Sequence, residues 1–157
     1  MIQRKQTIYL FFAGLIPLAL LFIPLGHLSS EVAYFDYNAF TVRDATPDHT
    51  FILSTIGNAI LLIATTVLSF FSIFLYKNRK AQMKLVSLNM VLILLAICSI
   101  MYFYPKFIFP KHLALDGVVI KYNYMIIISF ISAICLYFAK KAIAKDEAMI
   151  RSADRLR

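Results

Sequence analysis

The apolar residues of the chain gather into four long stretches, which polar and charged segments separate. The stretches cover about residues 8–25, 51–76, 85–104 and 119–138. Each is long enough for a helix that crosses a hydrocarbon core of about 30 Å, which takes roughly 20 residues. No Asp, Glu, Lys, Arg or His lies in the central part of any stretch. The pattern therefore predicts one integral membrane domain with four spanning helices.

The first stretch contains two prolines. A proline inside a helix has no N–H to donate, and a membrane helix tolerates it when neighbouring groups bond the carbonyl that is freed. We therefore expect Pro17 to bend the helix and to lie close to other helices, whereas Pro24 marks the helix end. The stretch also exceeds the roughly 7–15 apolar residues of a signal peptide, so we retain it as a span.

Basic residues are distributed unevenly between the two ends of these stretches. Twelve of the 16 lie near the termini or in the link 77–84: Arg4, Lys5, Lys77, Arg79, Lys80, Lys84, Lys140, Lys141, Lys145, Arg151, Arg155 and Arg157. The opposite side holds Arg43, Lys106, Lys111 and Lys121. Because Lys and Arg accumulate in cytoplasmic loops, both termini are expected in the cytoplasm.

The two outer loops, residues 26–50 and 105–118, contain short patterns that are typical of strands. Residues 32–42 are rich in aromatic and β-branched side chains and precede a turn-forming run, which reads as a strand and a turn. The second loop has short apolar runs at 107–109 and 118–120. We expect a small extracytoplasmic β-element built from one or both loops.

The segment after the last stretch, residues 139–157, contains no Gly or Pro that would interrupt a helix. Glu147 and Arg151 form a favourable pair at i and i+4, and Met149 and Ala153 share a face. We therefore expect a cytoplasmic helical extension. The predicted fold is an all-α membrane protein: a four-transmembrane-helix bundle with both termini cytoplasmic, a small outer β-element and this C-terminal helix.

The composition favours a lipid environment. Hydrophobic residues make up 61% of the chain and charged residues 15%, whereas soluble domains average about 45–50% and 25%. The net charge of +8 is explained first by orientation in the membrane. The basic cytoplasmic face could in addition attract anionic lipid, an acidic protein or ribosomal RNA. No feature points to DNA.

The cytoplasmic segments carry the residues best suited to bind a partner. Topology alone explains the basic link, but the tail mixes both charges in a compact pattern. Such mixing suggests specific pairing with the link or with another membrane protein. The candidate interaction residues are Lys77, Arg79, Lys80, Lys84, Asp146, Glu147, Arg151, Asp154 and Arg155.

Polar residues within the stretches are candidates for hydrogen bonds between helices, which contribute about 1 kcal/mol or less each. The two amides are Asn58 and Asn89, and the hydroxyls are Thr65, Thr66, Ser69, Ser72, Ser99, Ser129 and Ser132. Packing explains them better than a solute path, because no ionisable residue marks a path near the midplane. A small transporter or lipid-handling protein, with a path lined by Asn58 and the Ser and Thr residues, stays as the alternative.

Nothing in the sequence indicates catalytic or metal chemistry. His27, His49 and His112 all fall in outer loops, without the spacing of a site in which about three ligands converge on zinc. No strand-to-helix elbow such as G-x-S-x-G surrounds a serine. We expect no catalytic, metal or cofactor-binding residue. An envelope enzyme that acts through the outer loops is the weaker alternative.

Three segments carry a resemblance to a known family: Met1–Leu10, Asn78–Leu85 followed by Asn89, and the ending Lys145-Asp146-Glu147 with Arg151-Ser152-Ala153-Asp154-Arg155-Leu156-Arg157. Together with the four stretches, they resemble the bacterial domain-of-unknown-function family 4293. Lys5 departs from the aliphatic residue expected at its position. The resemblance implies a bacterial inner-membrane protein and supplies no activity. The leading hypothesis is therefore a non-catalytic accessory or scaffold subunit of an inner-membrane assembly.

Overall fold

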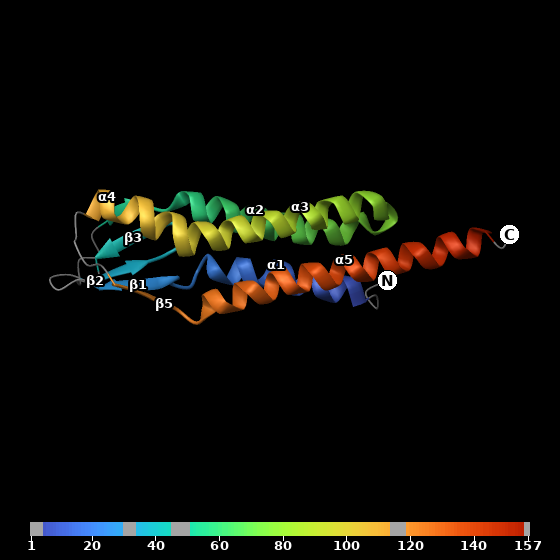
Figure 1. The fold of residues 1–157 in the computed structure, drawn as a ribbon, viewed down its shortest axis with the longest axis horizontal. Coiled ribbons are helices and arrows are strands. Elements are labelled where there is room, and N and C mark those ends of the chain that lie inside the picture. The colour runs from blue at the N-terminus through green and yellow to red at the C-terminus, as the bar shows by residue number, and fades with distance from the viewer. Residues whose placement is uncertain (1–4, 30–33, 45–50, 114–118, 156–157) are drawn as a thin grey trace.

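The computed structural model describes residues 5–29, 34–44, 51–113 and 119–155. Long helices run side by side, and a sheet lies at one end of them (Figure 1). Both termini lie toward the opposite end, and the last turns of α5 project beyond the other helices (Figure 1). The helical elements are α1 (Lys5–Leu20), α2 (Ile56–Phe74), the 3-10 turn η1 (Leu75–Lys77), α3 (Arg79–Cys98), the π-helical η2 (Ser99–Ile108), α4 (Phe109–Leu113) and α5 (Met125–Arg155).

Five short strands form one antiparallel sheet in the order β4-β3-β2-β1-β5. They are β1 (Gly26–Ser29), β2 (Tyr34–Tyr37), β3 (Thr41–Asp44), β4 (Phe51–Ser54) and β5 (Val119–Tyr122). The all-α class is therefore wrong, because the chain is a mixed protein of helices and a five-stranded sheet. Strand β4 was hidden inside a predicted span, since a short apolar strand that leads into an apolar helix has no separate hydropathy signal. The β-element expected from the loops is present, and β5 overlaps the apolar run predicted at 118–120.

The predicted four-span bundle also needs correction. Three helical segments are long and apolar enough to cross a membrane: Ile56–Lys77, Arg79–Lys111 and Ile126–Met149. The apolar part of α1, Gln6–Leu20, is shorter. The predicted first span ran to residue 25, but α1 ends at Leu20 and the chain then turns into β1.

The third long helical segment, which begins with α3 and is called the third rod below, continues further than the sequence suggested. α3 passes into η2 and then α4, so residues 107–109, predicted as part of an outer loop, are helical. Pro105 lies inside η2, where the Phe109 N–H donates to the Tyr104 carbonyl five residues earlier. The carbonyl of Met101, four residues before Pro105, accepts a hydrogen bond from the Tyr122 hydroxyl of β5 at 3.0 Å, which takes the place of the N–H that proline lacks.

Two clusters of buried side chains form the core. One joins the sheet to the helices and includes Leu28, Tyr37 and Val42, and the other lies toward the termini and includes Leu10 and Leu136. The outward faces of the helices remain apolar: exposed fractions reach 76% for Phe74 and 63% for Ile127. Those faces require lipid or a partner to cover them.

The proline of α1 is accommodated by a hydrogen bond from another helix. Pro17 frees the carbonyl of Ala13, four residues earlier, and the Ser132 hydroxyl of α5 donates to that carbonyl at 2.8 Å. On the neighbouring side, a Cβ on Gly14 would meet Ser69 Cβ of α2 at 3.0 Å. α1 is therefore held closely by both neighbours at the height of its proline.

Candidate functional site

A buried polar cluster joins the sheet to two helices. Asn58 of α2 donates from Nδ2 to the Tyr37 hydroxyl at 2.5 Å, and its Oδ1 accepts from the Ser99 hydroxyl at 2.6 Å. Tyr37 and Asn58 are fully buried, and the Tyr37 ring meets Phe109 edge-on at a centroid distance of 5.1 Å. Burial raises the pKa of the Tyr37 hydroxyl above its ordinary value of 10.0, although the bond from Asn58 acts in the opposite direction. The cluster thus holds a neutral phenol in a fixed position.

This arrangement fits a structural role for Asn58 better than a path for a solute. Both ends of its amide have protein partners, so a passing solute would have to displace the bond to Tyr37 or to Ser99. The hydroxyls of Thr65 and Thr66 donate to the carbonyl of Leu62 in their own helix. These residues satisfy their bonding within the fold.

Asn89, the second predicted interhelical amide, lies in a buried interface between α3 and α2. Its Nδ2 donates to Ser69 Oγ at 2.7 Å, and two turns earlier Gln82 Nε2 donates to the Ser72 carbonyl at 2.9 Å. Within the described part of the chain, Asn89 Oδ1 and Gln82 Oε1 have no hydrogen-bond partner. Sequence reasoning missed Gln82, because it assigned residue 82 to a solvated link.

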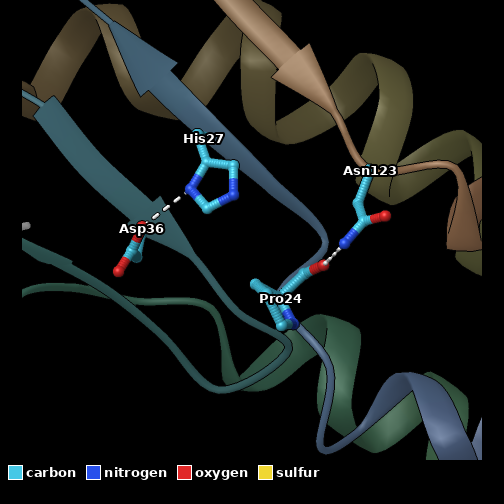
Figure 2. A network of polar contacts seen from close by, with 4 residues as sticks. All are labelled: Pro24, His27, Asp36 and Asn123. Atoms are coloured by element: carbon cyan, nitrogen blue, oxygen red, sulfur yellow. Dashed lines mark hydrogen bonds and ion pairs between the residues drawn. The ribbon is translucent and has the colours of Figure 1, made fainter.

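The outward face of the sheet carries a row of charged and ionisable side chains. In the strand register His27 lies opposite Asp36 and also opposite Lys121, and Asp36 lies opposite Arg43. His27 Nδ1 and Asp36 Oδ1 are 2.7 Å apart, as Figure 2 shows. Across the sheet the row therefore runs in the order Lys121, His27, Asp36 and Arg43, with one carboxylate among nitrogen-bearing side chains.

A second contact near this row ties the start of the sheet to the entry of α5. Asn123 Nδ2 donates to the Pro24 carbonyl at 3.3 Å (Figure 2), and the Asn123 N–H donates to the Leu25 carbonyl. No three His, Cys, Asp or Glu residues converge on a metal position among the residues that the structure describes. His49 lies outside those residues, and His112 belongs to α4.

At the other end of the molecule, the structure brings several predicted interaction residues together. Arg79, in the first turn of α3, donates from Nη1 to the backbone carbonyl of Asp146 in α5 at 3.1 Å. Beside this contact, an open groove of about 450 Å³ is lined by Lys80, Met83, Lys84, Ser87 and Glu147. The sequence suggested pairing of the tail with the link or with another membrane protein, and the structure shows a contact between link and tail, from the Arg79 side chain to the backbone of Asp146.

The remaining candidate interaction residues are placed by their elements. Lys77 ends η1 and is exposed. Arg151, Asp154 and Arg155 lie farther along α5, in its last described turns. The link itself is mostly helical, because Arg79 already begins α3.

An apolar groove follows the same seam between α3 and α5. It has a volume of about 230 Å³, and the side chains that line it are Met90, Leu94, Ala133, Ile134, Tyr137 and Phe138. Met90 is two helical turns, or about 10 Å, beyond Met83 on α3. The charged groove and the apolar groove therefore succeed one another along one seam.

The comparisons place the chain in a family. Residues 2–156 match the family described as Domain of unknown function (DUF4293). Because the match covers nearly the whole chain, the protein belongs to this family, and the resemblance found in the sequence is confirmed. Comparison with curated proteins finds no similar sequence.

Proposed function

We propose that this member of the DUF4293 family is a non-catalytic accessory or scaffold subunit of an assembly in the bacterial inner membrane. Three helical segments have the length and apolar composition of membrane spans, and only about a third of an apolar 18-residue stretch of each segment is buried inside the protein. A lone soluble protein would expose that apolar surface to water. Lipid and a protein partner are the surroundings that would cover it.

The charge distribution supports a cytoplasmic location for both termini. The two termini lie toward one end of the molecule and the sheet lies at the other (Figure 1). The basic residues of η1, α3 and the second half of α5 belong to the terminal end, which the positive-inside rule assigns to the cytoplasm. Reporter fusions after Arg157 and within residues 45–50 should report opposite sides of the membrane.

The observation that carries the scaffold role is the course of α5. The helix runs without a break from Met125 to Arg155, and its end projects beyond the bundle (Figure 1). Arg79, at the start of α3, holds it at the carbonyl of Asp146. Beyond that point Met149 is 53% exposed on a helix of mixed charge. A rigid projecting helix with an apolar residue among charges is suited to dock on a protein partner.

The test is purification of the tagged chain in mild detergent, followed by mass spectrometry of what remains bound. We expect a defined membrane protein to copurify, and to be lost when Met149 is changed to Asp. Ala148→Asp, one position along the helix and also exposed, is the matched control for added charge. A wild-type chain that always emerges alone and monomeric would overturn the scaffold role.

A transporter or lipid-handling protein is the second candidate. The buried oxygens of Asn89 and Gln82 favour it, since polar groups without partners inside a membrane bundle are the kind that a solute could use. Flux into liposomes that falls in Asn89→Leu and persists in Asn58→Leu would support a path between α2 and α3. Equal flux with and without the protein would exclude it.

A further inference from the structure

We propose that the seam between α3 and α5 is a binding site for one anionic phospholipid. The headgroup would occupy the charged groove and one acyl chain the apolar groove that follows it. The inference rests on the membrane setting proposed above, but it does not require a protein partner. The observation behind it is the order of the two grooves along one pair of helices.

The charged groove has the composition of a headgroup site. Lys80 and Lys84 lie one turn apart on α3 and are both exposed, so their ammonium groups can reach the same phosphate. Glu147 contributes one negative charge from α5, so the lining residues that the structure describes carry a net positive charge. A headgroup with a net negative charge restores neutrality, whereas a zwitterionic headgroup does not. Ser87 adds a hydroxyl that can donate to a phosphate or glycerol oxygen.

The apolar groove explains why the ligand is a lipid and not a free phosphate. Met83 forms part of the charged groove, and two turns farther along α3 Met90 opens the apolar one. Ala133 is the small residue on the α5 side, and its short side chain leaves room between Ile134 and Tyr137. An acyl chain laid there covers apolar surface continuously from the headgroup inward, as it would in a bilayer leaflet.

The position in the membrane is consistent with this orientation. Lys80 and Lys84 occupy the first turns of α3, at the terminal end of the molecule, and Leu94 lies deeper along the rod. A phospholipid of the cytoplasmic leaflet has its phosphate at the surface and its chains toward the midplane. The charged groove therefore lies at the level of the phosphate, and the apolar groove lies at the level of the acyl chains.

The test is native mass spectrometry of the purified protein in detergent with phosphatidylglycerol, phosphatidylethanolamine of the same acyl chains, or glycerol phosphate. We expect retention of phosphatidylglycerol over both others. Lys80→Gln with Lys84→Gln should weaken it roughly 30-fold, given the usual contribution of a basic residue near a lipid surface. Lys141→Gln with Lys145→Gln removes two exposed lysines at the same spacing outside the groove, and should change retention little.

A second pair of variants addresses the acyl chain. Ala133→Leu fills the apolar groove and should weaken phosphatidylglycerol retention, whereas Ala133→Ser keeps the space and should not. Equal retention of the two phospholipids, displacement by glycerol phosphate at similar concentration, or equal loss in the Lys141 and Lys145 variant would each overturn the site. If the lysine or alanine variants do not fold, the site is tested by comparing how the wild-type protein retains phosphatidylglycerol, phosphatidylethanolamine and glycerol phosphate. If the protein shows no preference for phosphatidylglycerol but still requires detergent to stay in solution, the lipid site is wrong and the proposed membrane location stands.

Discussion

At the scale of single residues, the bond between Ser132 and Ala13 makes a sharp prediction. Ser132→Ala leaves a buried carbonyl without a partner and should lower the free energy of unfolding by about 1–2 kcal/mol. In a Pro17→Ala background the new N–H of residue 17 can bond the Ala13 carbonyl, so the same change should then have a much smaller effect. Denaturation of the four proteins in detergent measures the coupling. Equal losses in both backgrounds would show that Ser132 acts otherwise.

Tyr37 supports a second prediction. Tyr37→Phe keeps the ring against Phe109 but removes the acceptor for Asn58 Nδ2, which should destabilise the fold by about 1–3 kcal/mol. Tyr34→Phe is the control, because Tyr34 lies on the same strand and is 67% exposed. Thermal unfolding of both variants checks the difference. Similar melting temperatures for the two would mean that the buried bond contributes nothing.

At the scale of elements, the close contact of β1 with β5 predicts the effect of one methyl group. A Cβ on Gly26 would lie 2.9 Å from the backbone carbonyl oxygen of Lys121, and backbone cannot yield as a flexible side chain does. Gly26→Ala should therefore loosen β5 and raise amide hydrogen exchange in residues 119–122, while exchange in α2 stays slow. His27→Ala, an exposed change one residue away, should leave β5 protected.

The elements also show what the sequence could and could not foretell. The long apolar runs indicated the helices, and the family ending at Lys145–Arg157 indicated the family. The strand at 51–54 stayed hidden because it continues the hydropathy of the helix it precedes, whereas the apolar run at 118–120 indicated part of β5. The helix through Pro105 contradicted the expectation of a loop, and a distant residue, Tyr122, bonds the Met101 carbonyl four residues before the proline. Gln82 was missed, because only the packing of α2 on α3 reveals that it is buried.

The charged residues of the candidate groove could be named from the sequence, but its geometry could not. Charge patterning drew attention to Lys80, Lys84 and Glu147, but only the pairing of α3 with α5 places them around one groove. The adjoining apolar groove depends on which faces of two distant helices meet. Periodicity within either helix does not contain that information.

At the scale of the whole molecule, the buried phenol of Tyr37 predicts a dependence of stability on alkaline pH. Burial raises its pKa in the folded protein, while the unfolded chain ionises near 10.0. Above that pH the unfolded chain has lost the Tyr37 proton that the folded protein still holds. The free energy of unfolding is therefore unaffected by this group below pH 10, and it falls by up to about 1.4 kcal/mol for each further pH unit. Unfolding measured between pH 9 and 11 should show a shallower decline in Tyr37→Phe. Parallel declines would assign the alkaline sensitivity to other groups.

The place of β5 in the sheet has a consequence for the order of assembly. Strands β1 to β4 come from the first third of the chain, whereas β5 follows the third helical rod, so Ser29 pairs with Val119 across 90 residues. During synthesis β1 therefore waits with one edge open until two further helices have been made. The pairing of β5 then joins the first and last parts of the chain at once. A nascent chain that stops before residue 119 should stay recognisable to quality-control proteases by that open edge, and the pairing of β5 with β1 should end this recognition.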